Sequence, residues 1–132
     1  MAGEKNLHTL LQNMAPTLQP GCFVFCTLQV ETIPTGFPII ASFREQEGLS
    51  VVVQQSVAER AGWTYASRMA WITLNVHSAL EAVGLTAAVA QALAKENISC
   101  NVIAAYYHDH LFVPSDQAED AMTALRQLSA TA

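Results

Sequence analysis

The second half of the chain contains one segment whose hydrophobic pattern is compatible with few structures. Residues 68–76 read RMAWITLNV, so both alternating faces of the expected strand are largely apolar. A strand of this kind is covered on both sides and lies in the middle of a sheet. A helical pattern follows at once, with Ser78 as its expected N-terminal cap, so we expect helices to cover this sheet.

The residues after this strand predict a helix, a hairpin and a second helix. The first helix should extend from Ser78 to about Glu96, with its apolar residues at core spacing. Residues 98–107 and 111–113 read as two strands joined by a tight turn around His108 and Asp109. Pro114 ends the hairpin and Ser115 can cap the last helix. The positions that face the core in the two helices are Leu80, Val83, Val89 and Leu93, then Ala118, Ala121, Met122, Leu125 and Leu128.

The first half repeats the alternation of helix and hairpin. Leucines at helical spacing predict a short helix over residues 7–14, which Pro16 ends. β-branched and aromatic runs predict three strands, and Gly62 can close a brief helix as its left-handed cap. The expected strands are 22–30, 39–43 and 49–53, and the brief helix is 55–61.

This order of elements predicts an α+β fold with a ferredoxin-like βαββαβ plan. The second half lacks only a closing strand, and the first half lacks an opening strand ahead of its first helix. We therefore expect two units that share strands within one compact α/β sandwich with antiparallel sheets. The segment GWTYASR, residues 62–68, is too short and too aromatic for a free tether. The expected division is an N-terminal unit over residues 1–66 and a C-terminal unit over residues 67–132.

The composition excludes several classes of partner. Charged residues make up 13% of the chain and hydrophobic residues 52%, which argues against disorder and coiled coil. The net charge of -5 and the pI of about 5.2 give no basic surface for nucleic acid or anionic membranes. Three cysteines are too few for a disulfide scaffold, and the first residues lack the pattern of a secretory signal. We expect a cytoplasmic protein with neither nucleic-acid nor membrane partners.

The corner between the central strand and its helix is the best candidate binding site. A strand that feeds directly into a helix presents free backbone N–H groups to a carboxylate. Gly84 lets a ligand approach the backbone closely, Asn101 offers donors and acceptors, and Asp109 can hold an ammonium group. Each of these residues also has an ordinary structural role in a helix start, a strand or a turn.

Other polar groups give weaker candidates. His108 and His110 project to one side of an extended strand, and His77 is the only obvious third ligand for a metal-assisted hydrolase. We expect no metal and no catalytic residues. Glu45 and Glu47 read as a solvated hairpin tip rather than an acid/base pair. Cys22, Cys26 and Cys100 have apolar neighbours and are expected to pack in the core.

The second half resembles an ACT domain, the small ligand-sensing module of amino-acid metabolism. The residues that carry the resemblance are GLTAAVAQALAKENISCNVIAAYYHDHLFVP, and it covers residues 68–129. FREQEGLSVVV in the first half is similar to the companion unit of uncharacterised bacterial tandem ACT-like proteins. These proteins are related in layout to the cytosolic arginine sensors of animals.

The resemblance implies a non-enzymatic regulatory protein without a cofactor. The ligand, an amino acid by this resemblance, would lie at the interface between ACT-like units, and the protein would form a homodimer. We expect no attached catalytic domain and no last strand in the second unit itself, and both would depart from the family's pattern. An interaction module without a ligand is the alternative from a different class. The residues implied to bind the ligand are Glu81, Gly84, Leu85, Thr86, Asn101, Tyr106 and Asp109.

Overall fold

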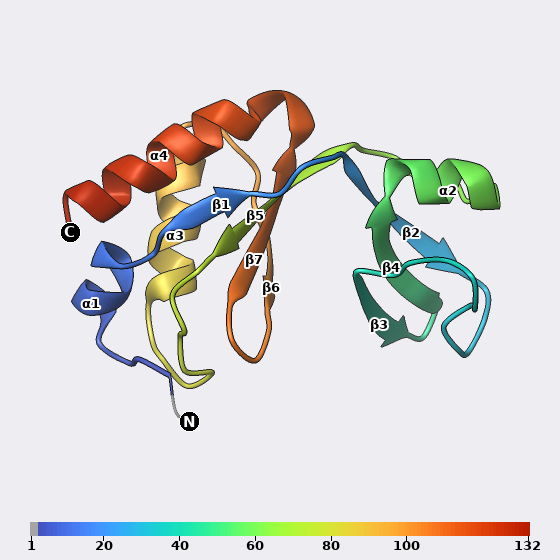
Figure 1. Cartoon of the computed structure of the whole chain (residues 1–132), viewed down its shortest axis with the longest axis horizontal. Coiled ribbons are helices and arrows are strands. Elements are labelled where there is room, and N and C mark those ends of the chain that lie inside the picture. Colours follow the sequence, from blue (N-terminus) through green and yellow to red (C-terminus); the bar gives the residue numbers. More distant parts are fainter. Residues whose placement is uncertain (1–2) are drawn as a thin grey trace. The chain divides into compact units, whose positions relative to one another are not determined.

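The computed structural model describes residues 3–132 and shows two compact units (Figure 1). The discontinuous unit combines residues 3–20 with residues 70–132, and the continuous unit spans residues 21–69. The contacts group the residues differently from the expected division into residues 1–66 and 67–132, which stays a prediction. Residues 3–20 belong, by their contacts, with the second half of the sequence.

The discontinuous unit has the strand order β1-β5-β7-β6. Strand β1 is antiparallel to β5, and Leu18 lies opposite Ile72. Strands β6 and β7 form an antiparallel hairpin in which Ala104 lies opposite Asp109. The elements are α1 (Leu7–Gln12), β1 (Pro16–Leu18), β5 (Met69–Leu74), α3 (Leu85–Lys95), β6 (Asn101–Ala104), β7 (Asp109–Pro114), the 3₁₀ turn η1 (Ser115–Gln117) and α4 (Ala118–Ala130).

The closing strand of this unit comes from the N-terminal part of the chain. In the order β5-α3-β6-β7-α4, the second half supplies five elements of a βαββαβ fold. Strand β1 supplies the sixth, at the sheet position that a closing strand takes beside β5. The expectation that incomplete units share strands is confirmed, and β5 has the predicted place in the middle of the sheet.

One hydrophobic core holds the discontinuous unit together. Alternate residues of β5 and β7, such as Ile72 and Leu111, face the helices and are almost completely buried. Leu10 of α1 and Met14, which follows α1, are inaccessible to solvent in the same cluster. From α3 and α4, the cluster takes Leu85, Val89, Leu93, Ala121, Met122 and Leu125.

The continuous unit contains a three-stranded antiparallel sheet and one helix. Its strand order is β3-β4-β2, and Phe23 of β2 lies opposite Met69 at the start of β5. The segment 29–40 connects β2 to β3 without a helix. The expected helix 55–61 and its cap are confirmed, because Gly62 has φ +75 and its N–H donates to the carbonyl of Glu59. The elements are β2 (Phe23–Leu28), β3 (Ala41–Glu45), β4 (Gly48–Gln54) and α2 (Gln55–Ala61).

The fold is therefore the expected α+β class. The discontinuous unit has the ferredoxin-like βαββαβ plan, and the whole arrangement is consistent with two ACT-type units. The sequence pattern failed at two helix starts. Helix α3 begins at Leu85 rather than at Ser78, and Leu80 and Val83 are 69% and 82% exposed instead of packed. Gly84 has φ +104, a left-handed conformation that a continuous helix cannot contain. Ser115 begins a 3₁₀ turn and makes no capping hydrogen bond.

Candidate functional site

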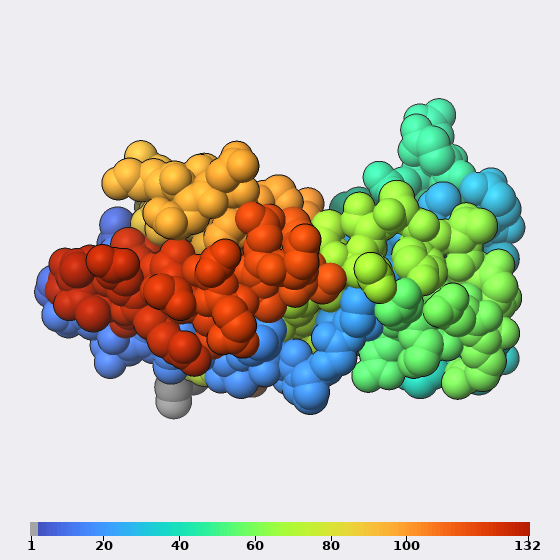
Figure 2. Space-filling model, turned by 90° about the horizontal axis from the view of Figure 1, so that it is seen from above, coloured from blue at the N-terminus to red at the C-terminus, as the bar shows by residue number. Residues whose placement is uncertain are grey.

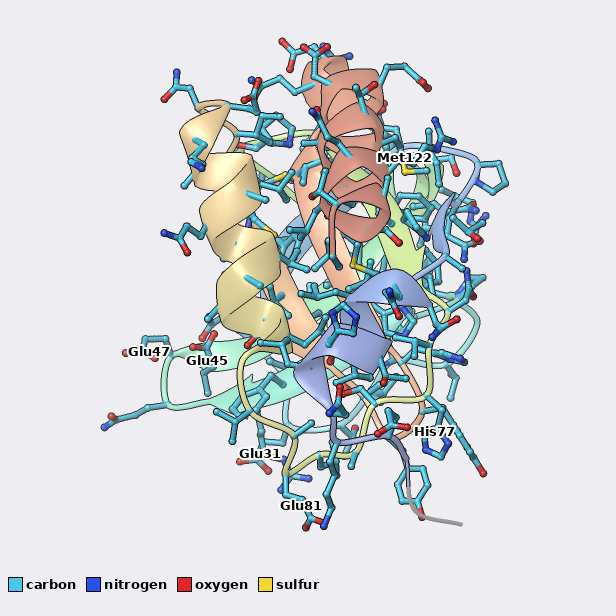
Figure 3. All side chains as sticks on the ribbon, turned by 90° about the vertical axis from the view of Figure 1, so that its left-hand side faces the viewer. Glu31, Glu45, Glu47, His77, Glu81 and Met122 are labelled. Carbon is cyan, nitrogen blue, oxygen red and sulfur yellow. The ribbon has the colours of Figure 1, made fainter. Side chains whose placement is uncertain are left out.

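The corner loop, residues 75–84, joins β5 to α3 and contains the first group of predicted site residues. Glu81 is exposed, and its carboxylate forms an ion pair with the Lys5 ammonium at 2.6 Å. That ammonium lowers the pKa of Glu81 through its hydrogen bond and its charge. Figure 3 shows Glu81 and His77 at the same end of this unit. Thr86 is exposed in the first turn of α3.

Gly84 is the cap residue of α3 and faces the N-terminal part of the chain. A Cβ at this position would lie 3.0 Å from Cδ2 of Leu7, which is tighter than ordinary van der Waals contact. We expected a ligand to approach the Gly84 backbone closely, but the Leu7 side chain fills that space. This contact forms because residues 3–7 run beside the corner loop, which the sequence pattern did not predict.

The hairpin tip contains the second group of predicted residues. Tyr106 is 61% exposed in the turn between β6 and β7. Asp109, the first residue of β7, is only 7% exposed. It lies on the same face of the strand as Leu111 and Val113, which is the face that the helices cover.

The Asp109 side chain is largely buried and has neither a hydrogen bond nor an ion pair among the described residues. No fully buried side-chain oxygen in that part of the chain lacks a partner, so the Asp109 carboxylate still reaches solvent. Burial raises the pKa of Asp109, while the positive charges of protonated His110 and His108 act in the opposite direction. A largely buried carboxyl group of this kind is stabilised either by taking up a proton or by a cation placed beside it.

Aromatic rings connect the corner loop to the hairpin tip. The rings of His77 and Tyr107 are 5.0 Å apart between centroids, and Tyr107 lies 4.9 Å from Tyr106. The structure therefore brings the corner and the hairpin tip together at one end of the unit. The residues that make this contact, His77 and Tyr107, were not among the predicted site residues. The signal for Tyr107 is the pair of tyrosines that ends the predicted strand 98–107, and His77 was considered only as a possible metal ligand.

Two predicted residues lie apart from this group. Leu85 is 3% exposed and packs in the core. Asn101 lies opposite Phe112, and its amide donates to the Phe112 carbonyl at 3.3 Å. Because side chains alternate along β6 and β7, Asn101 faces the opposite side of the sheet from Asp109. These two positions support the strands and the helix rather than the corner.

His110 takes part in a polar network on the other face of the sheet. The indole N–H of Trp71 donates to Nδ1 of His110 at 3.1 Å, and Oγ1 of Thr73 lies 3.1 Å from the same nitrogen. Burial lowers the pKa of His110, and a protonated His108 lowers it further. Because Nδ1 accepts from the indole N–H, the ring proton of His110 lies on Nε2.

The histidines do not assemble the metal site that we considered. Within residues 3–132, no three histidine, cysteine or acidic side chains lie close enough together to hold a metal ion. Glu45 and Glu47 lie at the exposed tip of the β3–β4 hairpin, where the Ser50 hydroxyl donates to Glu45. No helix within residues 3–132 is long and apolar enough to cross a membrane.

A shallow groove of about 630 Å³ lies on the outer surface of the discontinuous unit between α3 and α4. Figure 2 shows these two helices side by side. Lys95, Glu96 and Asp120 contribute the charged groups of the groove. None of the predicted ligand-binding residues lines it, so it is not the site that the corner and hairpin form.

The three cysteines are free thiols. Cys100 packs against the core of the discontinuous unit, and burial raises its pKa to about 11. Burial also raises the pKa of Cys26. A thiol with a raised pKa is a poor nucleophile at neutral pH, so these two positions are unsuited to catalysis.

This burial predicts slow alkylation of Cys100. At pH 8 its thiolate fraction should be about 100-fold below that of a thiol with pKa 9.0, the ordinary value for cysteine. We expect iodoacetamide to label Cys100 about 100-fold faster in denaturant than in the native protein, as measured by mass spectrometry of peptides. Equal rates in both conditions would contradict the buried position of this thiol.

Comparison with known families identifies the class of protein. Two ACT domain models match in tandem, one over residues 2–70 and one over residues 66–127. The first match alone covers more than half of the chain. The chain therefore belongs to the ACT domain family. A comparison with curated proteins finds no match.

Solved structures place the chain beside proteins with the same fold. A protein of unknown function from Vibrio cholerae, described as a possible transport protein, is 46% identical over 95% of this chain and 97% of that chain, with a TM-score of 0.83. A protein from Agrobacterium tumefaciens is 19% identical, covers 86% and 87% of the two chains, and has a TM-score of 0.63. The ligand-free regulatory subunit of aspartate kinase from Thermus thermophilus is 13% identical, covers 86% and 95%, and has a TM-score of 0.66. This chain thus has the ACT-type regulatory fold.

Proposed function

We propose that this chain is a non-catalytic regulatory protein that binds a free amino acid at the corner and hairpin tip of the discontinuous unit. The observation that carries the proposal is the Asp109 carboxylate, which is 7% exposed and has no ionic partner within residues 3–132. A ligand ammonium group would supply the missing cation. The membership in the ACT family, whose fold is regulatory, supports a role without catalysis.

The surrounding groups suit the remaining parts of an amino acid. The start of α3 offers the positive end of a helix of eleven residues to a carboxylate, beside the exposed Thr86 hydroxyl. Glu81 can add a second acceptor for the ammonium group once it is free of Lys5. Tyr106, which is 61% exposed beside Tyr107, can cover the ligand side chain. That the ligand lies between ACT-like units, as the resemblance implied, stays a prediction.

Assembly and location are part of the same proposal. Large hydrophobic side chains near this end of the unit are exposed, among them Leu80, Val83, Tyr106 and Tyr107. Exposed apolar groups in this number favour a further contact, so we propose that the protein forms a homodimer in the cytoplasm. The same observation favours a second candidate function, a protein-interaction module that binds no ligand.

Calorimetry with the free amino acids tests the proposal and separates the two candidates. We expect heat of binding from at least one of the twenty standard L-amino acids in the micromolar to millimolar range. The N-acetylated form of that amino acid lacks the ammonium group and should bind at least tenfold more weakly, because Asp109 would then face no cation. If none of the twenty binds in this range, the chain is not an amino-acid sensor and the interaction module is favoured.

A further inference from the structure

We infer that residues 3–7 form an intramolecular strap, which covers the corner loop and must be released before a ligand can bind there. The inference deepens the proposed function and rests on it, because the strap covers the site that we assign to the amino acid. Three contacts, at Glu4, Lys5 and Leu7, and the lack of room for a side chain at Gly3 support it.

The first contact is a backbone bridge. The N–H of Glu4 donates to the carbonyl of His77 at 2.8 Å, and the N–H of Ala79 donates to the carbonyl of Glu4 at 3.0 Å. Glu4 and Ser78 are paired in parallel by these bonds. The strap thus uses polar backbone groups of the corner loop that would otherwise face a ligand.

The lack of room at Gly3 explains why a glycine precedes this bridge. A Cβ at Gly3 would lie 2.7 Å from the amide nitrogen of Ala79 and 2.8 Å from the carbonyl oxygen of His77. Both atoms belong to the backbone and cannot turn away as a flexible side chain can. Any other residue at this position would push the strap off the corner loop.

The remaining contacts cover two of the predicted ligand-binding residues. Lys5 places its ammonium 2.6 Å from the Glu81 carboxylate. This is the place that a ligand ammonium would take. Leu7 lies against Gly84, at the point where a ligand would approach the backbone. The strap therefore pairs with Glu81 as a ligand ammonium group would, and it blocks the approach of a ligand to the Gly84 backbone.

The strap is held weakly enough to be released. Glu4, Lys5 and Leu7 are all exposed, and the ion pair between Lys5 and Glu81 is formed by side chains that are 61% and 70% exposed. Such pairs contribute little in water, and short exposed segments open locally without unfolding the rest of a domain. Only molecules with an open strap can bind the ligand. The apparent Kd is therefore the Kd of the open form divided by the fraction of molecules in which the strap is open.

Two strap variants and one control test the inference. Gly3→Val should displace the backbone bridge, and Lys5→Glu should replace the ion pair with a repulsion. Lys95→Glu makes the same change of charge in an exposed residue at the far end of α3 and is the control. The measurements are hydrogen exchange of the Ala79 amide without ligand, and calorimetry with each of the twenty standard L-amino acids.

We expect the Ala79 amide to exchange at least tenfold faster in Gly3→Val, and amino-acid binding to become about three- to tenfold tighter in both strap variants but not in Lys95→Glu. Binding that is detected only in the strap variants also supports the inference. Unchanged exchange and affinity would overturn it. Faster exchange with unchanged or weaker binding would overturn it too, while the proposed function would stand. Absence of binding in every variant, despite faster exchange, would refute the proposed function and the inference with it.

Discussion

A fragment of residues 67–132 should not fold by itself, although the sequence pattern treats it as one unit. The fragment lacks β1 and α1, and with them Leu10 and Met14, which are completely buried in the core. Removing one such side chain costs about 2–5 kcal/mol, while a whole domain is stable by only about 5–15 kcal/mol. We expect no cooperative thermal transition by circular dichroism.

A permuted polypeptide is the matched comparison for this fragment. It would contain residues 70–132, a flexible linker of about 15 Gly and Ser residues, and then residues 3–20. This order places α1 and β1 after α4, so that β1 closes the βαββαβ sequence. We expect the cooperative transition to return. Cooperative folding of the 67–132 fragment alone would support the expected boundary at residue 66 and contradict the packing described above.

The elements that were predicted best are those whose structure is determined by residues adjacent in the sequence. Helix α2 and its Gly62 cap depend on residues that are adjacent in the chain, and so does the apolar strand β5. Strand β1 was missed because its three residues lie between Ala15 and Pro20, in a stretch that reads only as the end of a helix. This strand exists because β5 pairs with it, and a pattern read along the chain does not contain that partner.

The site was predicted in part for the same reason. The sequence indicated a carboxylate in the hairpin turn and a glycine within the helix, whereas Asp109 begins strand β7 and Gly84 caps helix α3. It did not indicate that Asp109 would be buried, because burial depends on which face of β7 the helices cover. It also did not indicate the strap, whose contacts with residues 77–84 join distant parts of the chain.

Replacing Asp109 with asparagine should stabilise the protein without ligand and weaken amino-acid binding at least tenfold. The variant removes a partly desolvated charge that has no ion pair, so we expect its free energy of unfolding at pH 7 to rise by about 1 kcal/mol. The melting temperature should rise by about 2–8 °C. Thermal unfolding and calorimetry measure the two effects on the same sample. A gain in stability together with a loss of binding is typical of a residue that serves a ligand.

The pH dependence follows from the direction of the pKa shift. Burial raises the pKa of Asp109 in the folded protein, so the folded state holds this proton more tightly than the unfolded state. The ionised carboxylate therefore costs stability above the folded pKa, and this cost disappears as the pH falls through that pKa towards the ordinary range of aspartate. We expect the stability gap between Asp109→Asn and the wild-type protein to close on acidification.

Asp120→Asn is the control for this variant, because Asp120 is exposed in the first turn of α4 and the change of charge is identical. It should lose up to about 1 kcal/mol, since an acidic residue near a helix N-terminus is stabilising, and it should leave amino-acid binding unchanged. If Asp109→Asn instead destabilises the protein at pH 7 and binds amino acids normally, then the carboxylate supports the fold. The cation that it requires would in that case come from the protein and not from a ligand.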